Sequence, residues 1–294
     1  SKTELQNEIA KLVINQMESA GNNWTQSWST PKGYLPTSMS TGKSYNGINL
    51  LILGLTRSIH NYQSHEWATF NQWKKMGASV KKGEKSTQVI LYKKIQITDK
   101  SEAGKSEKIT VPLMRGFRVF NADQVEGYES PVTTVLENTI QPVTKADEIA
   151  AKCGAKIVND QVHRAFYRPS DDFINMPYCS QFESEEAYAA TLFHELTHWT
   201  RHERRLDRSF GHSKFGNEAY AIEELVAELG AAMLCGTNGI SSTPRDDHAS
   251  YLKSWIKAIK NKPSIIFTAA AKAAQAATYI DDLVEATEAT KIAA

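Results

Sequence analysis

Cysteine is scarce in this sequence, and its three cysteines lie far apart. Cys153, Cys179 and Cys235 form neither a CxxC pair nor an even-numbered set among the 294 residues. This pattern argues against a small domain held together by disulfides and against a zinc site built from paired cysteines. We therefore expect three reduced thiols, most of them buried.

Long apolar runs are missing as well. No stretch reaches the roughly 18 consecutive apolar residues of a membrane-spanning helix, and the N-terminal region lacks the apolar core of a secretory signal. The composition, with 41% hydrophobic and 23% charged residues, is typical of a globular protein. From these absences we expect a cytoplasmic protein with no membrane partner.

Net charge is almost absent overall, but it is divided unevenly along the chain. Residues 1–130 hold 17 Lys and Arg against 11 Asp and Glu, whereas residues 131–294 hold 17 against 22. A basic part and an acidic part suggest separate partners. Since residues 131–145 contain two prolines and little periodicity, we predict domains at 1–130 and 146–294 with a linker over 131–145.

Hydrophobic periodicity predicts an α+β protein. In the basic α/β N-terminal domain it indicates helices at 3–20, 47–59 and 64–77. It also indicates a small antiparallel sheet with strands at 86–98 and 111–125. The second domain is predicted to be mostly helical, with strands near 155–168 and 172–176 and helices at 146–154, 184–202, 217–235, 246–260 and 263–290.

The motif TLFHELTHWT at 191–200 carries the clearest chemistry. On a helix, His194 and His198 stand one turn apart on one face. Their ring nitrogens can bind one tetrahedral ion at about 2.0–2.1 Å. Glu195 lies beside that face, where it can act as a general base on a water molecule without being a ligand.

A pair of core histidines that satisfy one another is the alternative to a metal site. The same helix is apolar, with Leu192, Phe193 and Leu196, and is therefore expected to be buried. Burying two histidines and a glutamate without a partner would cost several kcal/mol. A bound metal removes this conflict, so the metal site is the favoured interpretation.

A third ligand is expected from the segment AIEELVAELGAAML at 221–234. Glu224 and Glu228 are four residues apart and share a helix face, while its small residues allow close helix packing. One glutamate can bind the metal while the other orients a ligand histidine. Glu223 is expected to face solvent. An ordinary exposed acidic face is the alternative for either glutamate.

The segment FINMP at 173–177 has two interpretations. It is either an edge strand that binds an extended peptide beside the metal or a strand of an ordinary hairpin. The sequence supports the two interpretations equally.

Lysine and tryptophan are concentrated in the first domain. Residues 71–118 hold 12 Lys and Arg against 4 Asp and Glu, and four of the six tryptophans precede residue 75. Phosphate-binding lysines beside aromatic rings are typical of single-strand binding, although a solvated charged face and core tryptophans are the plain alternative. We expect Trp67, Phe70 and Trp73 to be core, and we predict as DNA contacts Lys43, Tyr45, Asn46, Lys74, Lys75, Lys81, Lys82, Lys85 and Arg118.

Several long segments carry a resemblance to a known family. TGKSYNGIN, WATFNQWKKMGASVKKGEKSTQVILY and FRVFNADQVEGY lie in the first domain, and YAATLFHELTHWTRHERRL and FGNEAYAIEELVAELGAAMLCGTNGI lie in the second. Together they resemble the ArdC family of plasmid antirestriction proteins. The resemblance implies an N-terminal domain that binds single-stranded DNA without sequence preference and a zincin-like C-terminal metallopeptidase domain, similar to SprT-like proteases.

The resemblance also implies roles for individual residues. His194 and His198 would be metal ligands and Glu195 the catalytic glutamate. Gluzincins favour Glu224 as the third ligand with Glu228 behind it, although the spacing leaves the reverse open. SprT-like proteins take a third histidine shortly after the second, which makes His202 a competitor.

We therefore expect an antirestriction protein that binds single-stranded DNA and protects incoming conjugative plasmid DNA, with a metal-dependent peptidase acting on DNA-bound host proteins such as restriction enzymes. The alternative is a protein that only coats single-stranded DNA and has a structural or idle metal centre. Zinc is the expected ion and manganese could replace it. A metal-dependent nuclease is disfavoured, since such sites prefer carboxylate-rich two-metal clusters.

Overall fold

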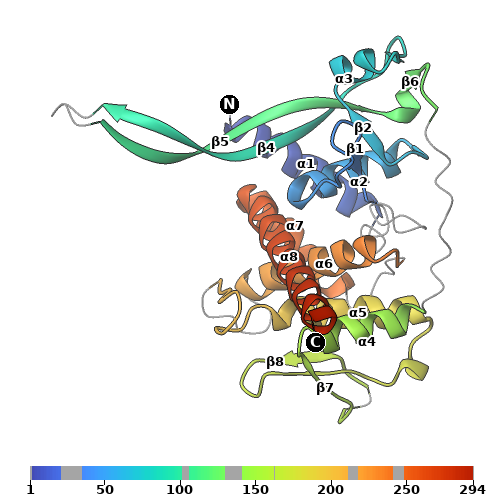
Figure 1. Ribbon diagram of the computed structural model, residues 1–294, viewed down its shortest axis with the longest axis vertical. Helices are drawn as coiled ribbons and strands as arrows, with labels where there is room; N and C mark the ends of the chain where they lie inside the picture. Colours follow the sequence, from blue (N-terminus) through green and yellow to red (C-terminus); the bar gives the residue numbers. More distant parts are fainter. Residues whose placement is uncertain are drawn as a thin grey trace.

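The computed structural model describes residues 2–20, 35–100, 106–129, 141–161, 163–210, 218–240 and 248–293. Helices and small sheets alternate along the chain (Figure 1), which confirms the predicted α+β class. No helix in these ranges is long and apolar enough to cross a membrane. All three cysteines are free thiols, two of them buried, as the sequence predicts.

The first part of the chain combines three α-helices with a four-stranded sheet. Its strands are ordered β1-β2-β5-β4, with β1 parallel to β2 and the other neighbours antiparallel. A two-stranded sheet joins β3 to β6. The elements are α1 (Lys2–Ala20), β1 (Thr37–Ser38), α2 (Gly47–Ile59), β2 (Glu66–Ala68), α3 (Phe70–Lys75), β3 (Ser79–Val80), β4 (Thr87–Lys100), β5 (Ser106–Asn121), η2 (Ala122–Gln124) and β6 (Val125–Glu126).

The helix predicted over 64–77 is wrong in its first half. Residues Glu66–Ala68 pair with β1 and β5 as strand β2, and only Phe70–Lys75 form helix α3. The helix begins at Thr69, whose side chain forms a capping box with Gln72. Trp67 and Trp73 are fully buried as expected, but Phe70 is 53% exposed and does not belong to the core.

Strands β4 and β5 form a long antiparallel ribbon. Their register runs from Thr87 opposite Val119 to Lys100 opposite Ser106. The base of the ribbon belongs to the sheet, whereas its far end extends well beyond the rest of the molecule (Figure 1).

The second part is mostly helical. Its three-stranded sheet is ordered β7-β9-β8, so β9, which contains the FIN of FINMP, is the central strand. The edge-strand interpretation of this segment is therefore wrong, because both sides of β9 are already paired. The elements are α4 (Pro142–Lys152), β7 (Lys156–Val158), β8 (Phe166–Arg168), β9 (Phe173–Asn175), η3 (Cys179–Gln181), α5 (Glu185–Trp199), α6 (Glu218–Thr237), α7 (His248–Asn261) and α8 (Ser264–Ala293).

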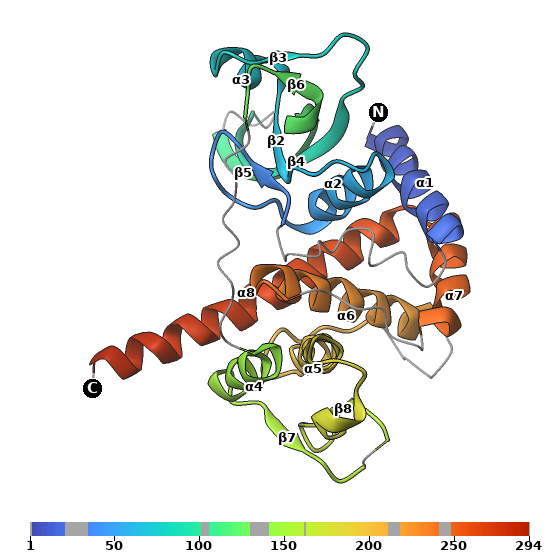
Figure 2. The same cartoon turned by 90° about the vertical axis from the view of Figure 1, so that its right-hand side faces the viewer.

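Helix α8 lies between the two parts (Figure 2). It packs on α6 from one side and on α2 from the other. Its small residues, Ala269, Ala270 and Ala273 among them, are fully buried and allow this close packing. One hydrophobic core includes Met17 of α1 and Leu51 of α2 together with residues of α5 to α8. The division into domains at 1–130 and 146–294 stays a prediction, and the two parts share a core.

Candidate metal centre

Helix α5 is set at its start by its own sequence. The Ser184 hydroxyl accepts a hydrogen bond from the Ala187 amide at 3.1 Å, and Glu185 and Glu186 occupy the first turn, where the helix dipole favours anions. This capping confirms the predicted start of the helix. From Tyr188 to Trp199 every residue of α5 is buried, so His194, Glu195 and His198 lie inside the protein.

Helix α6 approaches α5 closely because it presents a glycine at the contact. A Cβ atom added to Gly230 would lie 2.6 Å from both Oγ1 and Cγ2 of Thr197 on α5. Real Cβ atoms almost never come so near, so any other residue would push the helices apart. The small residue at this position brings the carboxylates of α6 within reach of the histidines of α5.

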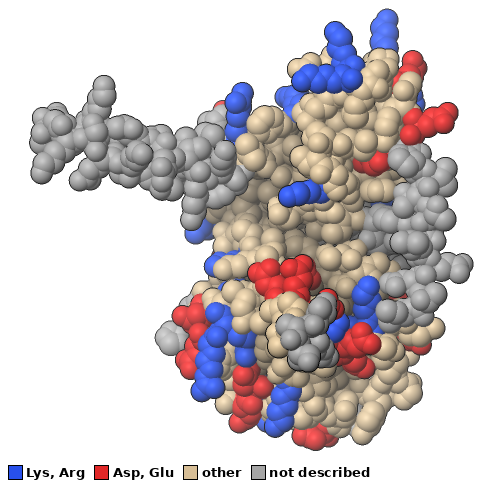
Figure 3. All heavy atoms as spheres, in the orientation of Figure 1, with Lys and Arg blue, Asp and Glu red and all other residues tan. Residues whose placement is uncertain are grey.

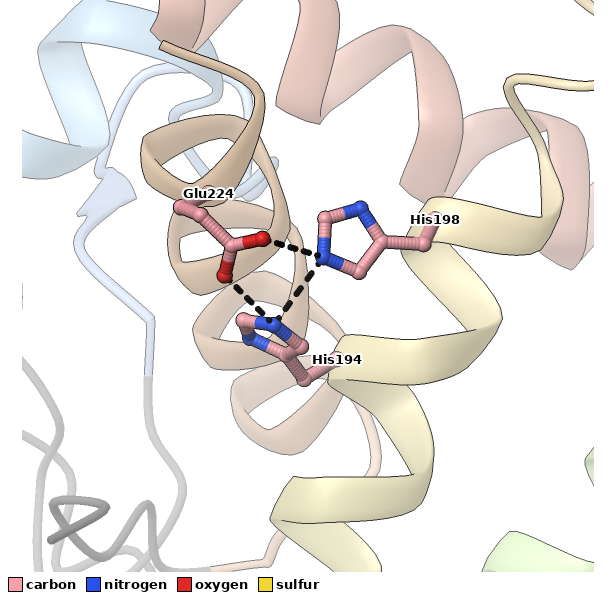
Figure 4. A group of neighbouring side chains, drawn as sticks. All are labelled: His194, His198 and Glu224. Carbon is pink, nitrogen blue, oxygen red and sulfur yellow. Dashed lines mark hydrogen bonds and ion pairs between the residues drawn. The ribbon is translucent and has the colours of Figure 1, made fainter. Parts of the chain in front are cut away.

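Three side chains converge between these helices (Figure 4). The Nε2 atoms of His194 and His198 are 3.1 Å apart, and each lies 3.4 Å from a carboxylate oxygen of Glu224. Two ligands of a tetrahedral ion at about 2.0–2.1 Å lie roughly 3.3 Å from one another. All three separations are close to this value, and the three buried groups form a set that could hold one metal ion. The donor set of two imidazoles and one carboxylate fits a divalent ion such as zinc.

A carboxylate lies behind each histidine. Glu228 Oε1 is 2.8 Å from Nδ1 of His194, and Glu223 Oε1 is 3.1 Å from Nδ1 of His198. Because a carboxylate only accepts, this arrangement favours a proton on Nδ1 and leaves the Nε2 lone pair for a metal. The prediction that Glu223 faces solvent is wrong, since the residue is 1% exposed. Adjacent glutamates project from different sides of a helix, but both sides of α6 are covered here.

Glu223 is held in turn by Arg208. The guanidinium donates to both carboxylate oxygens, at 2.7 Å and 2.9 Å, and also to Thr200 Oγ1 and the Thr197 carbonyl. Burial alone would raise the pKa of Glu223, but Arg208 and His198 outweigh it and lower the pKa to about 2. No sequence pattern singles out Arg208, because it lies outside the helices and 15 residues before its partner in the chain.

The ionisation of the metal-free group follows from its charges. Burial would lower the pKa of His198, but the carboxylates of Glu224 and Glu223 outweigh burial and raise the pKa to about 10. The same contacts lower the pKa of Glu224 against the effect of its burial. His198 therefore carries a proton at neutral pH in the metal-free protein, and a metal ion must displace it.

The structure does not bring every predicted residue to this group. His202 lies beyond the end of α5, where its Nδ1 accepts a hydrogen bond from the Arg204 amide. Among the described residues, it does not belong to the group that could hold a metal ion. Glu195 is 3% exposed and lies on α5 directly after His194. Its role as general base stays a prediction.

The residues predicted to bind DNA lie on the surface of the first part. Tyr45 is half-buried and the other eight are exposed. Lys and Arg side chains gather at the end of the molecule that carries α3 (Figure 3). Some of them are already engaged, since Lys81 Nζ donates to the Asp123 carbonyl at 2.8 Å. Their contact with DNA stays a prediction.

Comparison with known proteins agrees with this two-part arrangement. Residues 3–120 match the family model of the N-terminal domain of anti-restriction factor ArdC, and residues 144–272 match that of a zincin-like metallopeptidase. Among curated proteins, the uncharacterized protein y4eC of Sinorhizobium fredii (strain NBRC 101917 / NGR234) is 32% identical, over 95% of this chain and 92% of y4eC. Two DNA primases TraC of Escherichia coli are 38% and 37% identical over 92% and 95% of this chain. The chain spans only 19% and 27% of their lengths.

Two solved structures are similar along almost the whole chain. Both are of the antirestriction ArdC protein from the R388 plasmid, and both are 35% identical to this chain and covered over 98% of their length. The metal-free form matches 96% of this chain with a TM-score of 0.80, and the Mn(II)-bound form matches 95% with a TM-score of 0.78. A zincin-like domain, a buried His194–His198–Glu224 group and a manganese-bound relative together support a divalent metal at this site. The chain belongs to the ArdC antirestriction family.

Proposed function

We propose that this protein binds single-stranded DNA without sequence preference and protects incoming conjugative plasmid DNA from restriction, using a metal-dependent peptidase on DNA-associated host proteins such as restriction enzymes. The observation that carries the peptidase part is the buried group of His194, His198 and Glu224, with Glu195 on the same helix. The spacing of these three groups supports a metal site, because their donor atoms lie 3.1–3.4 Å from one another, close to the separation of ligands around one tetrahedral ion.

In this proposal, each residue of the site has a separate task. When bound, a zinc or manganese ion would polarise a peptide carbonyl and increase the acidity of a water molecule. His194, His198 and Glu224 would hold the ion, and Glu195 would accept the proton of the attacking water. Glu228 and Glu223 would fix the ring orientations of the two histidines.

The basic part would bring this site to its substrates. The exposed lysines Lys74, Lys75, Lys82 and Lys85 carry charge that is free to contact phosphates. Holding DNA and peptidase in one molecule raises the effective concentration of DNA-bound proteins at the metal centre. Cleavage would then be restricted to proteins that share the same strand.

The full-length Glu195→Gln variant tests the peptidase part. It should bind DNA and retain the metal, because Glu195 is not one of the converging ligands, but it should lose DNA-dependent proteolysis and plasmid protection. His194→Ala, which should lose the metal, serves as the second variant. Full protection by both variants would instead support the DNA-coating function with an idle metal centre. Absence of a salt-dependent gel shift with single-stranded DNA would refute DNA binding in either case.

A further inference from the structure

A groove opens in the first part of the molecule, about the base of the β4–β5 ribbon. Its volume is about 380 Å³, within the range of pockets that hold small organic ligands. The loop after β1, the starts of α2 and α3, and the two strands supply its walls. Its lining includes Lys43, Tyr45, Asn46, Leu91 and Phe117.

The floor of the groove is apolar and aromatic. Val89 and Val119 are buried beneath it, whereas Leu91 is 43% exposed and Phe117 is half-buried. Val89 lies opposite Phe117 in the ladder, so both side chains point to the same face of the ribbon. The Arg115 guanidinium lies over the Phe117 ring, 5.4 Å from its centre. A partly exposed ring together with the guanidinium over it offers planar groups against which a flat aromatic ligand can pack.

The rim of the groove is polar and, among its described residues, contains no carboxylate. Among the described lining residues Lys43 is the only cation, and the other polar residues are serines, threonines, amides and Tyr45. This combination favours an uncharged ring attached to an anion. A nucleotide has that chemistry, with a planar base and a phosphate.

The loop that carries Lys43 is fixed before any ligand binds. The Ser38 amide donates to the Lys43 carbonyl at 2.9 Å, and the Tyr45 amide donates to the Pro36 carbonyl at 2.8 Å. Gly42 turns the chain with a φ of +66°, a conformation that favours glycine. On the other wall, Asn49 is held by two hydrogen bonds to the Ile90 backbone. A preformed groove loses little entropy on binding.

We propose that this groove binds one unstacked base of single-stranded DNA, with the base against Phe117 and a neighbouring phosphate at Lys43. The proposal rests on the DNA binding proposed above and assigns it a base-binding subsite. Duplex DNA cannot offer the face of a base, because its bases are stacked on one another, so the groove selects single strands. Phe117, with Arg115 over its ring, becomes a binding residue outside the set of predicted DNA contacts.

Fluorescence anisotropy with the full-length protein tests this assignment. The probes are a labelled oligothymidylate and an abasic oligomer of equal length and charge. Wild-type protein should bind the oligothymidylate at least about fivefold more tightly, the effect of one stacked base. Phe117→Ala should remove this preference and leave the salt dependence unchanged. Lys43→Ala should make the negative slope of log K against log salt concentration shallower by about 0.7, the contribution of one phosphate contact to a single strand.

Two further variants control for folding and for loss of any aromatic residue. Phe117→Leu keeps apolar volume in the core and should lose most of the same preference, and thermal melting should show both Phe117 variants folded. Phe70→Ala removes an exposed ring that does not line the groove, and it should bind as wild type does.

The outcomes separate this proposal from the DNA binding on which it rests. Equal affinity of the wild type for both oligomers, or an undiminished preference in both Phe117 variants, would overturn the base subsite while DNA binding stands. No binding of either oligomer would refute DNA binding itself. Thymidine monophosphate that binds as tightly as the oligomer would reassign the groove to a free nucleotide and would also overturn the proposal.

Discussion

Replacing Arg208 by methionine should weaken both the fold and the metal site. The Arg208 side chain is only 1% exposed. Among the described residues, it is the only permanently charged group that forms an ion pair with Glu223. Removing one partner of such a buried pair costs about 3–5 kcal/mol of unfolding free energy. The other acceptors add little to this figure, because the Thr197 carbonyl still receives a hydrogen bond from Thr200 Oγ1 at 2.6 Å.

The effect should reach the metal through Glu223 and His198. Without Arg208, the Glu223 carboxylate is no longer fixed against Nδ1 of His198, and loss of such a supporting contact typically weakens metal binding about 10- to 100-fold. Urea unfolding measures the first effect, and competition with a chromophoric chelator for zinc or manganese measures the second. Arg208→Lys, which keeps the charge but not the two-pronged geometry, should lie between the wild type and Arg208→Met.

A matched control and a double variant test whether Arg208 acts on the site through Glu223. Arg204→Met removes an exposed arginine four residues before Arg208 and should change neither quantity. Combining Arg208→Met with Glu223→Gln should destabilise the protein by less than the two single effects added together, because the pair acts as a unit. A loss below about 1 kcal/mol in Arg208→Met, together with unchanged metal affinity, would refute the coupling of Arg208 to the site.

Three other predictions concern the same helix pair. Gly230→Ala should destabilise the protein by about 1–3 kcal/mol in urea unfolding, since its Cβ would meet Thr197. Adding Thr197→Ala should partly restore the loss. A double variant whose destabilisation equals the sum of the two single effects would contradict this. Glu228→Gln should lower metal affinity about 10- to 100-fold in a chelator competition, whereas exposed Glu218→Gln on the same helix should not. The pKa of His198 is raised to about 10 in the metal-free protein, so its protonation stabilises the fold. This stabilisation is complete below pH about 6.5 and is lost as the pH rises toward 10. Over that window the free energy of unfolding measured in chelator should fall, while metal affinity should rise. A flat profile for both would contradict the assigned ionisation.

Local sequence patterns predicted the parts of the site that depend on helix geometry. The four-residue spacings of His194 with His198 and of Glu224 with Glu228 place each pair on one helix face, and the structure brings these faces together. Long periodic segments such as α5 were likewise predicted within a few residues of their bounds.

The features that the sequence did not predict depend on contacts between distant parts of the chain. Whether Glu223 faces solvent depends on what covers the far side of α6, and that partner, Arg208, comes from an irregular segment. The order of three strands of three residues each is decided by packing, which is why the sequence left open whether FINMP is an edge strand or a strand of a hairpin. The start of α3, by contrast, is readable from the sequence, because TFNQ at 69–72 has the T-x-x-Q pattern of a capping box.

The position of α8 has a consequence for how such a protein can be divided. Because α8 is sandwiched between α2 and α6, a cut in the connection around residues 131–140 would separate segments that share one interior. An isolated N-terminal fragment would present the buried faces of α1 and α2 to water, and an isolated C-terminal fragment would present the opposite side of α8. Functional chimeras should therefore exchange the whole unit and not one half, in keeping with relatives that match 92–95% of this chain even where they are several times longer.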